Sequence, residues 1–77
     1  MIVKILGGGC PKCKILYNNV KSALRELEIE AEVIKIEEMS EIVTYGVMTT
    51  PALVINDKVV ATGQLKYKKV RELIKNG

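Results

Sequence analysis

The chain begins with an apolar segment and then changes to a helical pattern. Residues 1–6 are apolar apart from one lysine and run directly into three glycines. A short run of this kind is typical of a buried strand that enters a loop. From Pro11 onward, apolar residues recur at steps of three and four, which predicts an amphipathic helix that Pro11 can begin. The apolar positions of this helix are Cys13, Leu16, Val20, Ala23, Leu24 and Leu27.

The middle of the chain predicts a second strand and a short helix. Residues 30–36 alternate between polar and apolar and end apolar, as a strand does. Because a helix connects this strand to the first one, we expect the two strands to be parallel. Ser40 is expected to cap a short helix that continues to Tyr45 and ends at Gly46.

The last third predicts a hairpin followed by a helix. Two apolar runs, 52–55 and 59–61, are joined by Asn-Asp-Lys, and Asn and Asp tolerate the conformations of a tight turn. Gly63 then leads into a helix over residues 66–76, whose apolar face is Val70, Leu73 and Ile74. The predicted order is β-α-β-α-β-β-α, an α/β arrangement with a central four-stranded mixed sheet flanked by three helices.

Size and composition predict one domain over residues 1–77. The hydrophobic content of 48% is high enough for a core, whereas a disordered chain would be poorer in Ile, Val and Leu. The net charge is +3, and the densest basic run lies at residues 66–71. We interpret this run as the solvated face of the last helix, because the chain has no Trp or Phe to stack on bases. No nucleic-acid partner is expected.

No segment predicts export or membrane insertion. The apolar run at the N-terminus is too short for a signal peptide, and no run approaches the ~20 residues of a membrane span. We therefore expect a cytoplasmic monomer with no membrane partner. In that compartment a lone cysteine pair is more often catalytic or metal-binding than structural. A disulfide that closes so short a loop would stabilise the fold by only about 2 kcal/mol on the entropic model.

The two cysteines stand three positions apart, in the motif Cys10-Pro11-Lys12-Cys13. Cys10 lies where a loop meets a helix N-terminus, and there the free N–H groups and the helix dipole stabilise a thiolate. Lys12 and Lys14 add positive charge, and the three preceding glycines leave the Cys10 sulfur uncovered on that side. Cys13 lies on the inward stripe of the helix. The difference in exposure between the two cysteines predicts that Cys10 attacks a disulfide and that Cys13 resolves the mixed disulfide.

These features resemble the thioredoxin and glutaredoxin superfamily, in particular its small single-domain thioredoxin-like members in archaea and bacteria. The cysteine motif, residues 10–13, is similar to the Cys-Pro-x-Cys of glutaredoxins. Residues 45–51, Tyr-Gly-Val-Met-Thr-Thr-Pro, followed by the apolar run 52–55, are similar to the thioredoxin segment that leads through a cis-proline into the hairpin. The compatible order of elements extends the resemblance over essentially the whole chain.

The resemblance implies a thioredoxin-like fold and protein disulfide oxidoreductase activity. Cys10 and Cys13 would be the catalytic residues, supported by Pro11 and Lys12, and no cofactor or metal is expected. Protein disulfides as substrates and a thioredoxin-reductase-like electron donor follow from the same resemblance.

The resemblance also implies a substrate-binding segment around Pro51. The Thr50–Pro51 bond would be cis and would face the cysteines, so that the backbone of Thr50 could pair with an extended substrate. Gly63 matches a glycine that the family keeps after the hairpin. From the sequence alone, Pro51 could instead simply start an edge strand.

Several positions depart from the family pattern. Gly9 stands where thioredoxins carry Trp, and Lys4 stands near the place of a buried Asp that assists proton transfer in thioredoxins. That role is therefore unfilled or is met by another group. Lys35 either matches a lysine of the next thioredoxin strand or is an exposed strand residue. The acidic residue of the glutathione-binding turn of glutaredoxins is missing after Gly63, which favours exchange with protein dithiols.

Two alternatives remain open from the sequence. Zinc requires four ligands, and a chain with two cysteines and no histidine does not supply them within one monomer. Two thiolates do suit a soft ion such as Cu(I), and copper-chaperone domains carry a CxxC after their first strand. Those domains run β-α-β-β-α-β, so the topology decides. The second alternative is a regulatory binding module without turnover, in which the pKa of Cys10 would stay near the free value of about 8.5.

Overall fold

The order of elements in the structure is the predicted one. The computed structural model describes residues 1–7, 11–63 and 65–76. Within that part of the chain no helix has the length and hydrophobicity to cross a bilayer. The elements are β1 (Ile2–Leu6), α1 (Pro11–Glu26), β2 (Glu32–Ile36), α2 (Met39–Thr44), β3 (Ala52–Ile55), β4 (Lys58–Thr62) and α3 (Tyr67–Asn76). The predicted fold class is therefore confirmed.

The four strands form one mixed sheet in the order β2-β1-β3-β4. β1 pairs with β2 in parallel, as predicted from the intervening helix, and Val3 lies opposite Val33. β3 pairs antiparallel with both β1 and β4. β1 and β3 are thus the central strands. All four residues of β3 are buried, which explains why this strand is an uninterrupted apolar run.

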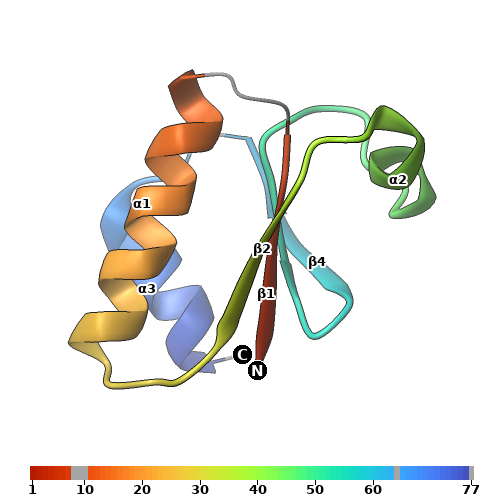
Figure 1. Cartoon of the computed structure of the whole chain (residues 1–77). Coiled ribbons are helices and arrows are strands. Elements are labelled where there is room, and N and C mark those ends of the chain that lie inside the picture. Colours follow the sequence, from red (N-terminus) through yellow and green to blue (C-terminus); the bar gives the residue numbers. More distant parts are fainter. Residues whose placement is uncertain (8–10, 64, 77) are drawn as a thin grey trace.

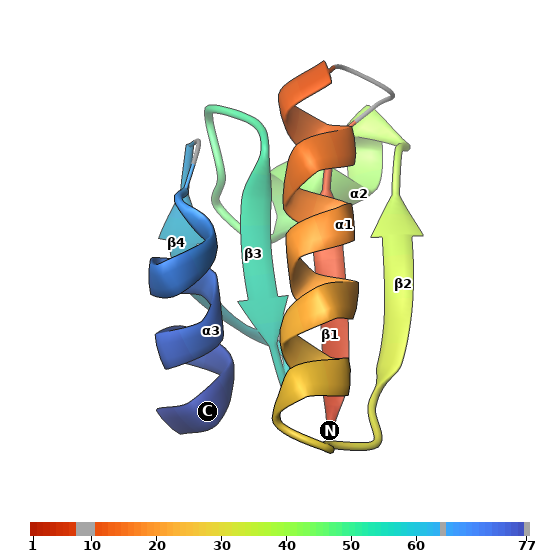
Figure 2. The same cartoon turned by 90° about the vertical axis from the view of Figure 1, so that its left-hand side faces the viewer.

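Helices cover both faces of the sheet (Figure 1). α1 and α3 lie side by side on one face, as the view from that side shows, whereas α2 lies on the other (Figures 1 and 2). Successive side chains of β1 point to opposite faces of the sheet, so this strand contributes to two apolar clusters. Val3 and Ile5 pack under α1 and α3, whereas Leu6 belongs to the cluster with Ile42 of α2.

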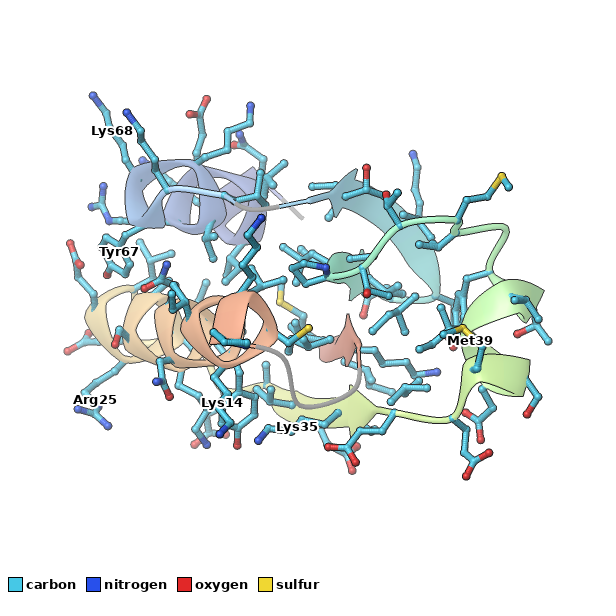
Figure 3. The ribbon with its side chains drawn as sticks, turned by 90° about the horizontal axis from the view of Figure 1, so that it is seen from above. Lys14, Arg25, Lys35, Met39, Tyr67 and Lys68 are labelled. Atoms are coloured by element: carbon cyan, nitrogen blue, oxygen red, sulfur yellow. The ribbon has the colours of Figure 1, made fainter. Side chains whose placement is uncertain are left out.

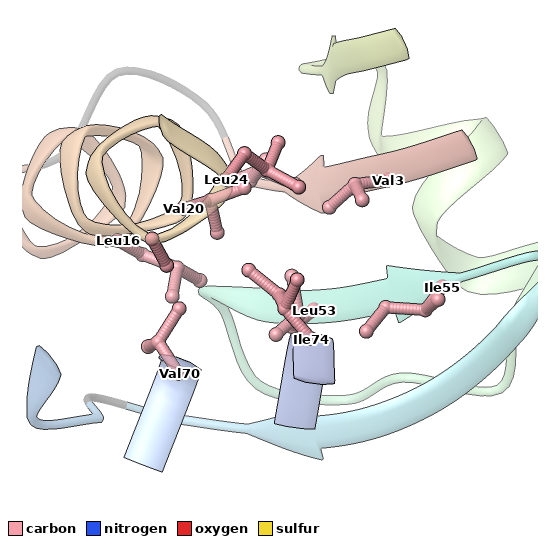
Figure 4. Close-up of a cluster of buried hydrophobic side chains, with 10 residues drawn as sticks. Val3, Leu16, Val20, Leu24, Leu53, Ile55, Val70 and Ile74 are labelled. Atoms are coloured by element: carbon pink, nitrogen blue, oxygen red, sulfur yellow. The ribbon is translucent and has the colours of Figure 1, made fainter. Parts of the chain in front are cut away.

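The apolar stripe of α1 is buried as its spacing predicts. Cys13, Leu16 and Val20 are at most 5% exposed. Ala23 and Leu24 continue the same face. Leu16, Val20 and Leu24 contact the cluster that Val70 and Ile74 contribute from α3 (Figure 4). Full burial of one such Val, Leu or Ile side chain contributes about 1.5–3 kcal/mol, so this interface fixes where α1 lies on the sheet.

The start of α2 differs from the prediction. Ser40 does not cap this helix, because it already lies inside the first turn. Glu38 is the N-cap. Its backbone is extended, and its carbonyl oxygen accepts hydrogen bonds from the N–H groups of Glu41 and Ile42 at 3.1 and 3.0 Å. These are the first hydrogen bonds of the helix itself, and Glu38 makes no capping hydrogen bond with its side chain. Gly46 ends the segment as predicted, with a φ of +74°.

The hairpin turn contains two residues rather than three. Asn56 and Asp57 have φ values of +50° and +66°, the signature of the tight turn that matches strand twist. Lys58 belongs to β4 and lies opposite Ile55. Asn56 also ties the turn to β1: its Oδ1 accepts a hydrogen bond from the Ile2 N–H at 3.0 Å, and its own N–H donates to the Ile2 carbonyl oxygen at 2.9 Å.

A polar contact joins α1 to α3 at the end of the helices away from Cys13. The carboxylate of Glu26 accepts a hydrogen bond from the Tyr67 hydroxyl and pairs with Arg71 Nε at 3.0 Å. The hydrogen bond to Glu26 raises the pKa of Tyr67 above its ordinary value of 10.0, and partial desolvation acts in the same direction. The neutral phenol is therefore the form that the folded protein favours.

This contact predicts a loss of stability at alkaline pH. The folded-state pKa of Tyr67 is raised above its unfolded value of about 10. The contribution of its hydrogen bond to the free energy of unfolding is therefore complete below about pH 10, and it is lost as the pH rises through the folded-state pKa. Tyr67→Phe should be less stable than the natural chain near neutral pH, and the difference should shrink at alkaline pH. Denaturant unfolding between about pH 8 and pH 12 measures it. Tyr17→Phe keeps the ring that lies beneath Lys35 and is the control; an equal effect of both variants would contradict the assignment.

Candidate functional site

The candidate site lies at the end of the sheet where β1 stops and α1 begins. Pro11 and Lys12 are the first two residues of α1, and both are exposed. Cys13 follows them in the first turn, with 5% of its surface exposed. Cys10 and Gly9 lie outside the described residues. The inward position predicted for Cys13 is thus observed.

Gly7 lies close to both Cys13 and Thr50, which belongs to the segment before β3. A Cβ built on Gly7 would approach the Cys13 Sγ closer than 3.0 Å, a separation that real Cβ atoms essentially never show, and would lie 3.4 Å from the Thr50 Cβ. The φ of Gly7 is +150°, and its N–H donates to the carbonyl oxygen of Ile36 at 2.9 Å. The sequence suggested that the glycines uncover Cys10. In the structure, Gly7 leaves space for the sulfur of Cys13.

The predicted substrate-binding residues lie in the same region. The Thr50–Pro51 peptide bond is cis, and Thr50 is exposed whereas Pro51 is buried. Gly63 has a φ of +81°, and its N–H donates to the Pro51 carbonyl oxygen at 2.7 Å. β3 begins at Ala52 between β1 and β4, so Pro51 does not start an edge strand. Residues far apart in the sequence therefore meet beside Cys13.

A small cavity of about 70 Å³ adjoins Cys13. Its lining residues are Ile5, Gly7, Cys13, Lys14, Lys35 and Glu37. Lys14 and Lys35 lie on the same side of the molecule, where α1 passes beside β2 (Figure 3). A larger hollow of about 750 Å³ lies at the other end of α1, around Arg25 and Glu30, and is separate from Cys13.

Of the two interpretations of Lys35, the structure bears on one, that of an exposed strand residue. Lys35 is an exposed residue of β2, and its Nζ lies 4.3 Å from the centre of the Tyr17 ring on α1. This cation–π contact holds the lysine side chain across the gap between strand and helix. The same side chain lines the cavity at Cys13.

Lys4 points away from the cysteine. It precedes Ile5 in β1, and successive strand residues face opposite sides of a sheet. Its Nζ donates to the Tyr45 hydroxyl at 2.9 Å and pairs with Asp57 Oδ1 at 3.1 Å. The hydrogen bond to Tyr45, followed by that to Asp57, raises the pKa of Lys4. The position near which thioredoxins carry a buried acid thus holds a structural cation.

Sequence reasoning missed Met48. This apolar side chain is 99% exposed, in the loop that leads from α2 to Pro51. No local signal in the sequence marked this exposure, because the neighbouring Val47 lies in the same loop and is buried.

The fold and the site together define the thioredoxin-like class: a mixed four-stranded sheet, and a helix that begins within a CxxC pair and faces the segment before β3. The chain belongs to the thioredoxin domain family, whose model matches residues 1–75.

Two archaeal relatives and two solved structures are similar to the chain. A thioredoxin of Methanocaldococcus jannaschii is 36% identical over 77 residues, which cover 99% of this chain and 88% of the relative. A thioredoxin of Methanothermobacter thermautotrophicus is 35% identical over 69 residues, 90% of each chain. Thioredoxin 1 of Thermosipho africanus shares the fold with a TM-score of 0.69 at 21% identity, covering 99% of this chain and 92% of its own. The Deadhead thioredoxin of Drosophila melanogaster shares the fold with a TM-score of 0.67 at 23% identity, and the match covers 97% of this chain and 78% of the Deadhead chain.

The approach of Gly7 to Cys13 predicts the effect of a single added methyl group. Gly7→Ala would place its Cβ against the sulfur and should lower the free energy of unfolding by about 1–3 kcal/mol, the usual range for overpacking. Gly46→Ala is the control. It has a positive φ, but its Cβ would meet no atom within 4 Å, so only the backbone cost of about 1–2 kcal/mol remains. Urea unfolding measures both variants. Equal losses would mean that Gly7 is needed only for its backbone conformation.

Proposed function

We propose that the chain is a small thiol-disulfide oxidoreductase acting on protein disulfides. Cys10 attacks the substrate disulfide, and Cys13 resolves the mixed disulfide. The observation that carries this proposal is the convergence of Cys13 and Thr50 on Gly7, in a chain of the thioredoxin domain family. Residues 1–77 act as one domain in this proposal, as a monomer in the cytoplasm.

The start of α1 supports nucleophilic chemistry at the cysteine pair. The first N–H groups of a helix have no intrahelical partner and favour a negative charge nearby. Lys12 and Lys14 are exposed in the first turn and add positive charge. These features favour a thiolate at Cys10. Cys13 is 5% exposed, and this burial suits a cysteine that reacts with its neighbour rather than with an incoming substrate.

The segment before β3 supports binding of an extended substrate. Thr50 is exposed beside the cysteine end of the sheet, while Pro51 behind it is buried and held by Gly63. An exposed backbone on a fixed support can pair with a peptide strand, which fits substrates that are proteins. The fully exposed Met48 offers an apolar contact on the same loop. A thioredoxin-reductase-like protein would supply the electrons.

The alternative of a copper carrier loses its structural basis. Copper-chaperone domains end in a strand and run β-α-β-β-α-β. This chain runs β-α-β-α-β-β-α, which is the order of elements of the thioredoxin fold. The CxxC pair alone would then be the only argument for metal transport, and the same pair serves disulfide exchange.

Trapping of the mixed disulfide tests the proposed division of labour. Cys13→Ser should accumulate a covalent complex with a disulfide-bonded protein such as insulin, because the resolving sulfur is missing. Cys10→Ser should form no such complex, and its reductase rate should fall to that of the uncatalysed reaction. Non-reducing electrophoresis and mass spectrometry measure both, with the double variant as control. Equal trapping by both single variants would contradict the assigned roles.

A further inference from the structure

The free edge of β2 is a surface that the proposed disulfide exchange does not use. We propose that this edge binds an extended acidic segment of a partner protein. The segment adds to the sheet as a further strand beside β2, and one of its carboxylates lies between Lys21 and Lys35. This interaction is separate from the chemistry of Cys10 and Cys13, so it stands or falls independently of the proposed function.

The backbone of β2 is unpaired on one side. β2 is the outermost strand of the sheet, and within the part of the chain that the structure describes only β1 pairs with it (Figure 2). The Ile36 carbonyl oxygen points toward β1, where it accepts a hydrogen bond from the Gly7 N–H at 2.9 Å. Because backbone groups alternate along a strand, the N–H and carbonyl groups of Val33 and Lys35 point away from β1. Such a row of groups is a template on which an extended chain can add.

A hollow of about 750 Å³ lies beside this edge, between β2 and α1. Leu24, Ile29 and Val33 contribute apolar side chains to its lining. Lys21 and Arg25, both exposed, line it from α1. Alternate side chains of an added strand would point to the same face of the sheet as Val33 and would therefore enter the hollow.

Two lysines on this face share one aromatic ring. The Nζ of Lys35 lies 4.3 Å from the centre of the Tyr17 ring, and that of Lys21 lies 5.9 Å from it. The ring packs against the core and keeps the two ammonium groups near each other. Neither ammonium group makes a salt bridge with a carboxylate of the described residues. In Figure 3, Lys14 and Arg25 lie on the same side of the molecule as Lys35. A carboxylate between the two ammonium groups would interact with both.

The acidic residues of this face lie at its two ends. Glu28 and Glu30 line the hollow at the turn before β2, and Glu37 follows the last residue of β2. The middle of the edge is therefore positive and its ends are negative. The segment that complements this pattern is acidic at its centre and carries no acidic residue at its ends.

A second copy of the chain does not complement this edge. Two β2 strands that paired over their whole length would run antiparallel about Ile34, as the two-fold symmetry of a dimer requires. The Lys21 and Lys35 ammonium groups of both copies would then lie on the same face of one continuous sheet. Their repulsion opposes that pairing, as lysines on edge strands commonly do, whereas it favours an acidic segment.

A titration of the ¹⁵N-labelled, reduced full chain with a synthetic peptide tests the inference. The probe is the peptide Thr-Val-Glu-Val-Glu-Val-Thr, blocked at both ends, which has its two glutamates at the centre of one face. We expect saturable shifts of the backbone amide signals of Val33 and Lys35. Exchange of these two N–H groups with solvent should slow about tenfold or more at saturation, because they gain hydrogen bonds. The peptide with lysine in place of both glutamates should not bind.

Three variants locate the charges that the peptide recognises. Lys21→Gln and Lys35→Gln should each weaken binding of the acidic peptide about twofold to fivefold, the range of an exposed ion pair. Lys68→Gln is the control, because it removes the same charge from an exposed position on α3. It should bind the peptide as the natural chain does.

Three results would overturn the inference. The first is equal binding of the basic peptide, or an equal loss in all three variants, which would indicate attraction without a defined site. The second is binding that leaves the Val33 and Lys35 amides unprotected. The third is protection of these amides without peptide, in a chain that sediments as a dimer, since a second copy would then occupy the edge. None of these results bears on the disulfide exchange, which the trapping experiment tests separately.

Discussion

The absence of a side chain at Gly7 is the constraint on which the site depends. β1 lies between two partner strands and reaches Gly7 at its end, where the N–H is bound to Ile36 of β2. At that point the sulfur of Cys13 and the side chain of Thr50 approach so closely that a Cβ would collide with the sulfur. The close packing of the helix start, the central strand and the segment before β3 follows from this one position.

The two faces of the sheet are stabilised by different interactions. Under α1 and α3 a continuous apolar cluster, which includes Val3, Leu16 and Leu53, fixes the helix that carries the cysteines. On the other face Lys4 connects β1 to Tyr45 and Asp57, and so supports the end of α2 and the hairpin turn. The chemistry that we propose lies at the end of the sheet where α1 begins, and there Lys14, Lys35 and Glu37 are among the residues that line a small cavity.

The sequence predicted those helices and turns whose formation depends on residues close together in the chain. The stripe from Cys13 to Leu24 predicted α1 because burial of one helix face requires that spacing. Asn56 and Asp57 predicted the turn because they tolerate positive φ. The prediction of Ser40 as a cap was wrong because the helix begins at Met39, after the N-cap Glu38, so that Ser40 lies within the first turn.

Contacts between distant residues left no local signal. Lys4 meets partners 41 and 53 positions away, and its role was therefore not predicted. Of the site, the sequence motifs indicated Cys13, Thr50, Pro51 and Gly63. The approach of Gly7 to Cys13, the cavity and the presence of Glu37 in it depend on how α1 lies on β1 and β2, which only tertiary packing determines.

A titration of the natural chain in redox buffers shows whether Cys10 and Cys13 work as a dithiol pair. Free thiols are trapped by alkylation at each potential, and the products are weighed. We expect one two-electron transition in which Cys10 and Cys13 become protected together, at a midpoint within the span of about −270 to −120 mV that thioredoxin-fold proteins cover. A pair that stays reduced over that range, or cysteines that react independently of each other, would contradict this expectation.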